Sequence, residues 1–414
     1  MRRLLQLRPN AAGVAETKLP VLDRASFGRP PAVTIKRLSE LPIYLDHHAT
    51  TPCDPRVVEA MLPYFSQQFG NPASATHEHG RQAAKAVEHA RIEVAKFLGV
   101  EPGEVYFTSG ATESNNLALH LLQTGDGLIT SAMEHRSILV PARRLAGRGI
   151  DVTVLEPDQE GFIAPKQVAD AIGAKTRMVS IEAANGEIGT TQRIKAIGAL
   201  CRARGVWFHT DATQAAGKVP MDLSNVDLAS ISAHKFYGPK GIGALIVRRG
   251  IRIEPLIEGG GQERNARSGT VNVPAVVGMA EALRICRELM GEEAQRLTAL
   301  RTLLWDRLTS EIEEVHVFGP RELRLPGNLN ASFERVDAES IMIAMRHFSL
   351  SSGSACSSGQ HGPSPVLQAI GAVDALAFGA IRFGLGRSTT SEHIALLVDD
   401  LTRTVRRLRE ISAA

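Results

Sequence analysis

The sequence predicts an α/β fold in which a mostly parallel sheet lies between layers of helices, followed by a smaller α+β domain. Two observations lead to this prediction. Between about residues 80 and 247, helical and strand patterns alternate with short connections, as in β-α units that build a parallel sheet. After Pro274 the alternation gives way to a long helical stretch and then to short strands mixed with helices, which indicates a second domain.

The elements of the first domain follow from the spacing of apolar residues. A first helix is expected at 81–98, where Ala84, Val87, Val94 and Leu98 share one face. Short β-rich runs predict strands at 105–108, 128–131, 151–155, 177–182, 206–211, 226–231 and 242–247. Amphipathic stretches predict helices at 112–122, 137–147, 165–173 and 192–204. In such a sheet, ligands bind beyond the carboxyl ends of the strands.

The second domain is expected to begin with a long helix at about 275–314. Further patterns predict strands at 315–318, 329–333, 348–352 and 381–385, and helices near 338–346, near 364–371 and from 391. We place the boundary near residue 290, so that a large domain covers 53–290 and the small domain joins 43–52 to 291–414. Residues 1–42 are rich in proline and basic residues without apolar periodicity, so we expect a loosely structured extension.

The composition is that of a soluble globular protein. Of the 414 residues, 43% are hydrophobic and 22% are charged, and the net charge of +3 gives no reason to expect a nucleic-acid partner. The apolar runs are far shorter than the roughly 20 residues that span a bilayer, so no membrane partner is expected. We expect a cytoplasmic protein; the alternative is an organellar one, if residues 1–42 are a presequence.

The cysteines, at 53, 201, 286 and 356, form no CxxC pair, which argues against a zinc or iron–sulfur ligand set and against a disulfide scaffold. Cys201 and Cys286 lie within amphipathic helical patterns. Cys356 lies in a Ser- and Gly-rich stretch without apolar periodicity, where a partly exposed, nucleophilic thiol fits better than a buried structural one. The histidine pairs at 47–48 and 77–79 lack carboxylate or cysteine partners at ligand spacing, so we expect no metal.

The stretch 226–247 places Lys235 on a glycine-rich turn between two apolar strands. Such a lysine is either an ordinary solvated side chain on a hairpin or a desolvated amine, which is the usual Schiff-base nucleophile. Residues 109–114 leave a strand through glycine and begin a helix, which is either a phosphate cradle or simply a capped helix start.

Asp211 ends a strand at the same edge of the predicted sheet, where it could hold a protonated ring nitrogen or cap a helix. Enzymes that use pyridoxal phosphate (PLP) need a lysine, a partner for the pyridine nitrogen and a phosphate site. The combination of Lys235, Asp211 and the 109–114 turn therefore favours the functional interpretation of each.

Ten motifs carry a resemblance to a known family. In chain order they are LDHHATTP (45–52), FGNPAS (69–74), FTSGATES (107–114), EH (134–135), NGEIG (185–189), HTDATQAAGK (209–218), SAHKFYGPKGIGAL (232–245), GGGQERNARSGT (259–270), SSGSACSSG (351–359) and IRFGLGR (381–387). Over roughly residues 43–410 the chain resembles the cysteine desulfurases. These are class-V aminotransferase-like enzymes with the PLP-dependent transferase fold of type I, and the match resembles the branch that supplies sulfur for iron–sulfur clusters and tRNA thiolation.

The resemblance assigns roles around the cofactor ring. It implies that Lys235 forms the Schiff base with PLP, that Asp211 binds the pyridine nitrogen and that Gln214 donates to the ring hydroxyl. His135 would stack on the ring.

It also implies a substrate-carboxylate pair, Asn185 and Arg382, a role that suits the fork of donors of an arginine. The phosphate ligands that it implies are Ala111, Thr112, Ser232 and His234, with Thr270 supplied by the second subunit of a homodimer. The active site would then be shared between the two subunits.

The resemblance further implies the reaction, in which L-cysteine loses its Cα proton to Lys235 or His135 and PLP takes up the resulting charge. Cys356 would then attack the substrate's sulfur, keep it as a persulfide and release L-alanine. The sulfur would pass to an acceptor protein, either a scaffold or a thiolation relay. Cys356 is also a candidate transient ligand of an iron–sulfur cluster on the scaffold.

Some positions depart from the family pattern. Residues 357–365 read SSGQHGPSP, without the acidic residue that this branch often carries soon after its nucleophile, so the choice of partner stays open. Gly186 stands where a second asparagine is common. The chain ends at Ala414, without the longer tail that contacts the scaffold in some members, so we do not assume that partner.

Two other functions stay open at this point. Another PLP enzyme of the same fold, such as an aminotransferase or a selenocysteine lyase, would not need Cys356 for its own substrate. A catalytically silent interaction subunit would not need the lysine, aspartate and cysteine that this sequence retains.

Overall fold

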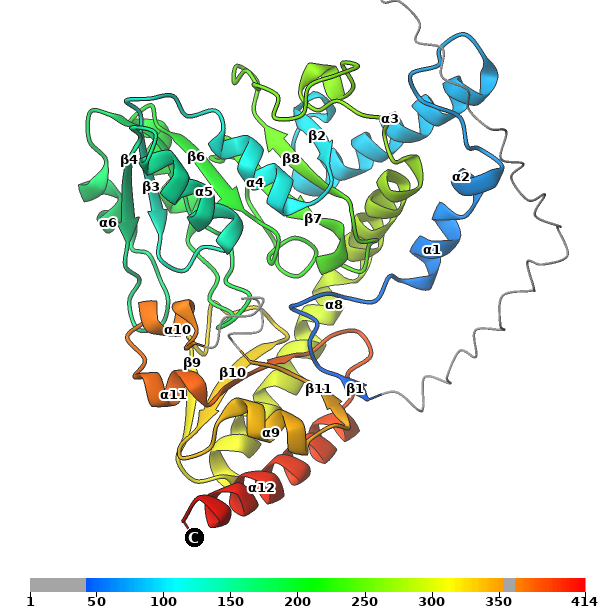
Figure 1. Ribbon diagram of the computed structural model, residues 1–414. Coiled ribbons are helices and arrows are strands. Elements are labelled where there is room, and N and C mark those ends of the chain that lie inside the picture. Colours follow the sequence, from blue (N-terminus) through cyan, green and yellow to red (C-terminus); the bar gives the residue numbers. More distant parts are fainter. Residues whose placement is uncertain (1–41, 353–361, 414) are drawn as a thin grey trace, which may run out of the picture. The chain divides into compact units, whose positions relative to one another are not determined.

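The computed structural model describes residues 42–352 and 362–413. Its largest element is a seven-stranded sheet with the strand order β2-β8-β7-β6-β5-β3-β4 (Figure 1). The strands are β2 (Val105–Thr108), β3 (Gly127–Ser131), β4 (Asp151–Leu155), β5 (Thr176–Ser180), β6 (Trp207–Asp211), β7 (Leu228–Ser232) and β8 (Gly243–Val247).

The strands from β7 to β4 run parallel to one another, and β8 lies antiparallel to both of its neighbours, β7 and β2. Parallel neighbours need a long crossover, whereas an antiparallel pair is joined by a short turn. The short turn between β7 and β8 carries Lys235. The predicted α/β fold with a mostly parallel sheet is confirmed.

Helices cover both faces of this sheet (Figure 1). On strand β7, Leu228 belongs to a core with Leu117 and Ile138, which come from helices on one face. The neighbouring Ala229 belongs to the core on the other face. This alternation explains why the strand reads as a continuous apolar run. The helices are α3 (Glu78–Leu98), α4 (Ala111–Leu119), α5 (Arg136–Ala146), α6 (Pro165–Ala171) and α7 (Ile194–Ala203).

A second, smaller sheet is antiparallel and has the order β12-β13-β10-β9. It packs with helices into a core of its own that includes Leu329, Phe383 and Leu397. The elements are β9 (Val315–Phe318), β10 (Asn328–Phe333), α9 (Ala338–Ala344), β12 (Ser351–Ser352), α10 (Pro365–Ala369), α11 (Asp374–Phe378), β13 (Ala380–Gly384) and α12 (Ser391–Ala413). A smaller α+β unit is therefore present, as predicted.

Helix α8 (Val273–Glu311) contributes to both cores. Its first half supplies Val276 and Leu283 to the core of the large sheet, and its second half supplies Leu304 and Leu308 to that of the small sheet. The predicted domain boundary near residue 290 lies inside this helix, and we keep it as a proposal.

The single strand predicted at 348–352 is wrong. Phe348–Ser349 forms β11, which pairs in parallel with β1 (Ile43–Tyr44), whereas Ser351–Ser352 forms β12 in the small sheet. A run of apolar and serine residues carries no sign that its pairing partner changes at Leu350. Helices α1 (Pro55–Met61), α2 (Pro63–Ser66) and α11 were not predicted, although Asp54 caps the start of α1.

None of the helices in the described part of the chain is long and apolar enough to cross a membrane.

A buried ion pair anchors the loop that follows β8. Arg91 of α3 donates to both carboxylate oxygens of Glu263, at 2.9 and 2.8 Å, and both side chains are 4% exposed. Glu263 also accepts the backbone N–H of Phe107 at 2.8 Å. Glu263, Arg264 and Asn265 all have positive φ, so this strained turn depends on its side-chain anchor.

We expect Arg91→Ala to lower the free energy of unfolding by about 3–5 kcal/mol, because it leaves the Glu263 carboxylate buried without its partner. Urea unfolding followed by circular dichroism measures this. Arg81→Ala is the matched control, since Arg81 pairs with Glu78 on the exposed face of the same helix and should cost at most about 1 kcal/mol. Equal losses in the two variants would contradict the expectation.

Candidate active site

A cavity of about 630 Å³ lies at the carboxyl ends of the parallel strands, where the sequence predicts ligand binding. Its wall also takes Arg382 from β13 of the small sheet. The predicted site residues that line it are Ala111, Thr112, His135, Asn185, Asp211, Gln214, Ser232, His234, Lys235 and Arg382. Thr270 is exposed and is not part of this lining, and Cys356 lies outside the described residues.

Lys235 ends a short 3₁₀ turn, η4 (Ala233–Lys235), between β7 and β8. Its Nζ donates to the backbone carbonyls of His48, at 2.8 Å, and Ala49, at 2.7 Å. The side chain is half-buried. The structure therefore places this amine against the wall of the cavity and not in open solvent on a hairpin.

Asp211, at the end of β6, is held by donors on both oxygens. Asn115 Nδ2 donates to Oδ2 at 2.7 Å, and the backbone N–H of Thr213 donates to Oδ1 at 3.0 Å. The same Asn115 nitrogen donates to Ser137 Oγ at 2.8 Å, which joins Asp211 to the start of α5. The carboxylate is 7% exposed and is fixed in orientation.

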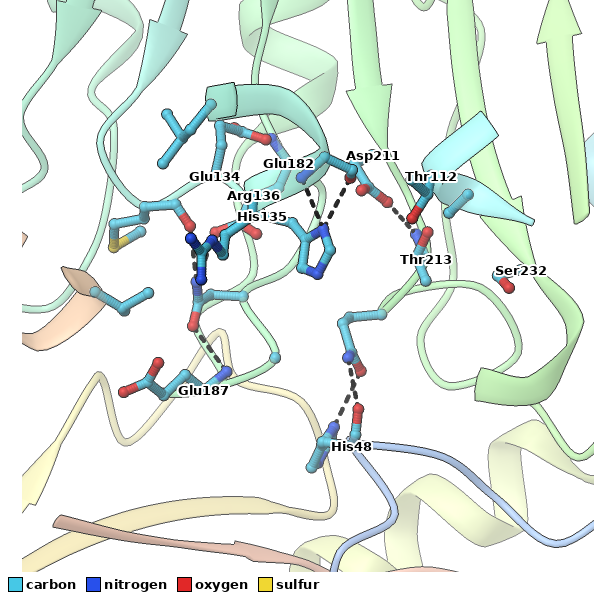
Figure 2. A pocket seen from close by; sticks show the side chains of 18 of the residues that line it. His48, Thr112, Glu134, His135, Arg136, Glu182, Glu187, Asp211, Thr213 and Ser232 are labelled. Carbon is cyan, nitrogen blue, oxygen red and sulfur yellow. Dashed lines mark hydrogen bonds between the residues drawn. The ribbon is translucent and has the colours of Figure 1, made fainter. Parts of the chain in front are cut away.

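His135 caps α5 and presents its ring to the cavity (Figure 2). Nδ1 accepts the backbone N–H of Ser137 at 3.1 Å, so the neutral ring carries its proton on Nε2. Partial desolvation within the cavity lowers the pKa of His135 below its usual value, with Asp211 opposing this effect. A neutral ring with a fixed tautomer can both stack on a flat ligand and exchange a proton through Nε2.

The predicted phosphate ligands meet at the start of α4. Ala111 and Thr112 form the first turn of this helix, whose free backbone N–H groups favour an anion. Ser232 ends β7 and His234 lies in the turn after it, and both line the same cavity. Burial, with a smaller effect of Lys235, lowers the pKa of His234 to about 4, so its ring is neutral at pH 7. Of the two interpretations of residues 109–114, this geometry favours an anion site over a helix start that is only capped.

The amide of Gln214 has one defined orientation. Lys218 Nζ donates to its Oε1 at 2.8 Å, so the oxygen faces Lys218, and Nε2 donates to the His48 carbonyl at 2.9 Å. Gly186 makes room for this side chain: a Cβ at residue 186 would lie 2.6 Å from Gln214 Nε2. The glycine that departs from the family pattern is therefore matched to the position of Gln214.

Asn185 and Arg382 line the cavity from opposite sheets. Asn185 Oδ1 accepts the backbone N–H groups of Glu187 and Ile188, at 2.9 and 3.0 Å. Arg382 Nη2 donates to Asp46 Oδ1 at 2.8 Å, and Nη1 donates to the Gly186 carbonyl at 3.3 Å. The two residues predicted to hold a substrate carboxylate thus come together, and each is already oriented by neighbours.

Sequence reasoning missed a group of carboxyls in the lining, namely Glu134, Glu182 and Glu187 (Figure 2). Burial raises the pKa of Glu182 to about 8 and that of Glu187 to about 7, and it raises the pKa of Glu134 well above its usual value. Glu182 and Glu187 are therefore protonated over part or all of the neutral range. Their position directly after β3 and β5, at the ligand edge of the sheet, was the available signal.

Asn115 and Lys218 were also missed, because each acts through another residue. Within the described residues, no group of histidine, cysteine, aspartate and glutamate side chains could hold a metal ion.

Both ends of the segment that contains Cys356 lie at the cavity. Before it, Ser351 accepts a hydrogen bond from Arg382 Nη2 at 3.4 Å, and after it, Gly362 and Pro363 are part of the lining. Position 356 comes four residues after Ser352 in the sequence, and four residues of extended chain span at most about 14 Å.

Comparisons with known proteins agree with this geometry. A family model described as Aminotransferase class-V matches residues 43–397. A protein from Klebsiella pneumoniae named cysteine desulfurase IscS is 49% identical, over 90% of this chain and 95% of its own length. A solved NifS-like protein superimposes with a TM-score of 0.83 at 35% identity, covering 89% of this chain and 100% of its own. A structure described as SspA in complex with cysteine has a TM-score of 0.73 at 36% identity, covering 83% and 98%.

We expect Glu187→Gln to stabilise the protein increasingly as pH rises from about 4.5 to about 7, the pKa of Glu187 in the fold. In this window the folded protein keeps a proton on Glu187 that the unfolded chain releases, so ionisation favours unfolding, and glutamine removes that effect. Urea unfolding at a series of pH values measures the difference. Glu160→Gln, at an exposed carboxyl, is the control. The expectation would be contradicted if the difference in the free energy of unfolding between Glu187→Gln and the unchanged protein did not vary with pH.

Proposed function

Since the chain belongs to the class-V aminotransferase family and, within it, to the cysteine desulfurases, we propose that the cavity around Lys235 is its active site. There the enzyme converts L-cysteine to L-alanine and transfers the sulfur to Cys356. The solved relative described as in complex with cysteine supports this choice of substrate.

The chemistry of the lining fits PLP, the cofactor of this family. An amine, Lys235, stands on one wall, and a carboxylate with fixed orientation, Asp211, stands at the end of β6. Thr112 and Ser232 add hydroxyls at the start of α4. We propose that Lys235 forms the covalent bond to the aldehyde carbon of PLP. Asp211 would bind the pyridine nitrogen, and Gln214 would donate to the ring hydroxyl. The start of α4, together with Ser232 and His234, would bind the phosphate. When bound, PLP withdraws electrons from the Cα–H bond of an amino acid.

The protein's own residues would bind the substrate and move its protons. Arg382 and Asn185 would hold the carboxylate through N–H groups that converge on the cavity. Asp211 would accept a hydrogen bond from the ring nitrogen, because two hydrogen bonds fix the orientation of its side chain. Lys235 would take the Cα proton, and His135 Nε2 would return protons to the product.

Cys356 would carry out the sulfur transfer. Its thiolate attacks the substrate's sulfur, so an S–S bond forms while the Cβ–S bond breaks and its electron pair stays with the carbon fragment. Cys356 keeps the sulfur as a persulfide, and the carbon fragment takes up protons and leaves as alanine. The observation that carries this proposal is that Lys235, Asp211 and both ends of the Cys356 segment converge on one cavity.

We expect Cys356→Ser to keep the yellow absorbance of bound PLP but to lose release of alanine from L-cysteine by at least about 100-fold, because the sulfur has no acceptor. In the unchanged protein, incubation with L-cysteine should add one sulfur to the peptide that contains Cys356, as read by mass spectrometry.

Cys201→Ser is the matched control, since Cys201 is a buried thiol of α7 and should leave both results unchanged. Full turnover of L-cysteine by Cys356→Ser would instead support another PLP enzyme of this fold. A purified protein that lacks the absorbance of PLP would support a silent interaction subunit.

We further propose a homodimer in which Thr270 of the partner subunit completes the phosphate site. Leu62, Phe65 and Phe69 of the α1–α2 region are 59–64% exposed, which leaves an apolar surface that a second copy would cover. Thr270 is itself exposed and lies outside the lining of its own chain's cavity.

Mixing two inactive variants tests the shared site. Lys235→Ala removes the amine, and Thr270→Asp puts a negative charge at the phosphate, so each homodimer should be inactive. In a mixed dimer, one of the two sites has both wild-type residues. Because random exchange makes about half of the dimers mixed, it should restore about a quarter of the wild-type activity. If each subunit held a complete site of its own, mixing would restore none.

The acceptor of the sulfur is proposed by class only: a protein thiol of an iron–sulfur scaffold or of a thiolation relay, with Cys356 as a transient cluster ligand on the scaffold. A cytoplasmic location is supported by Cys53, Cys201 and Cys286, which are free thiols, as expected in a reducing compartment.

A further inference from the structure

Glu182 lies directly beside the residue that we expect to hold the substrate's carboxylate. It follows β5, lines the cavity and is 7% exposed (Figure 2). Its Oε1 accepts a hydrogen bond from Asn185 Nδ2 at 2.8 Å. A buried carboxyl at this place is unexpected, because a second negative charge would oppose an incoming carboxylate.

The contact with Asn185 has one chemical orientation. Asn185 Oδ1 accepts two backbone N–H groups, so its nitrogen must face Glu182. The second hydrogen on that nitrogen has a weak contact with the Met133 carbonyl at 3.4 Å, which leaves it available to a ligand. Glu182 therefore holds the amide in the position from which it can donate into the cavity.

We propose that Glu182 is a positioning and specificity residue: it orients Asn185 for the substrate's carboxylate, and it does so as an uncharged acid. This inference rests on the proposed role of Asn185 in the active site.

The surroundings of Glu182 favour its uncharged form. Glu134 Oε1 accepts the backbone N–H of Glu182 at 2.6 Å, and the Glu134 side chain is 3% exposed. Burial is the main cause of the raised pKa of Glu182, and the negative charges of Asp211 and Glu187 add to it, whereas the hydrogen bond from Asn185 opposes it. Arg382 lowers the pKa of Glu187. Glu182 is thus protonated at pH 7 and loses its proton above pH 8, its pKa being about 8.

The sign of the effect on binding follows. Below pH 8 the uncharged acid accepts from Asn185 without repelling the substrate. Above pH 8 the carboxylate keeps the hydrogen bond but repels the substrate, so affinity falls as pH rises. Other groups titrate in this range too, and the comparison between variants at the same pH removes their contribution.

The test compares the holoenzyme with Glu182→Gln, which keeps an acceptor oxygen but cannot ionise. The dissociation constant of L-alanine is measured through the visible absorbance of bound PLP at pH 7 and pH 9, and KM and kcat for L-cysteine are measured in parallel. At pH 7 we expect the two proteins to have similar dissociation constants for L-alanine. At pH 9 we expect the unchanged protein to bind L-alanine about tenfold more weakly than Glu182→Gln. The inference would be overturned if the ratio of the two proteins' dissociation constants were the same at pH 7 and at pH 9.

Glu182→Ala tests the orienting role, and it should raise KM about 3- to 10-fold at both pH values with a much smaller change in kcat. A kcat loss without a KM change would overturn this role. Glu160→Gln serves as the control for an exposed carboxyl. If the unchanged protein binds L-alanine but releases no sulfur from L-cysteine, the proposed desulfurase function is wrong. The comparison of L-alanine binding between the unchanged protein and Glu182→Gln then still tests the role of Glu182.

Discussion

The short segment at residues 46–51 contacts both halves of the proposed active site, and the rest of that site depends on it. The carbonyls of His48 and Ala49 accept from Lys235 Nζ, while Asp46 accepts from Arg382. Thr51 donates its hydroxyl to the His234 carbonyl at 2.8 Å, which holds the segment against the turn before Lys235. One stretch of chain therefore sets the spacing between the amine of the large sheet and the guanidinium of the small sheet.

The sequence predicted most of the large sheet because its strands are short apolar runs separated by amphipathic helices. It failed where pairing depends on distant partners: the 348–352 run changes sheets at Leu350, and nothing in its own residues shows this. Asp211 could be found because it ends a strand at the ligand edge, and Lys235 because it lies on a glycine-rich turn between two apolar strands. Asn115, Lys218 and Glu182 could not, since their importance lies in contacts with Asp211, Gln214 and Asn185 that only the fold creates.

Burial weakens the charge of two acids in the lining, Glu182 and Glu187, and of a lysine behind it, Lys218, which contacts Gln214. Burial lowers the pKa of Lys218 well below its usual value, with Lys235 and Arg382 adding to the effect, just as it raises the pKa values of Glu182 and Glu187. In the proposed function, the charges of the PLP phosphate and of the substrate's carboxylate would then be met by a few fixed donors.

Helix α8 passes through both cores without a break, and this continuity constrains how the protein can move. A hinge between the two sheets would have to bend a helix held on one side by Leu283 and on the other by Leu304. The helix therefore links the large sheet, beside which Lys235 lies, to the small sheet, which contains Arg382. A substitution that bends this helix between Leu283 and Leu304 would therefore change the distance between Lys235 and Arg382 while leaving both residues intact.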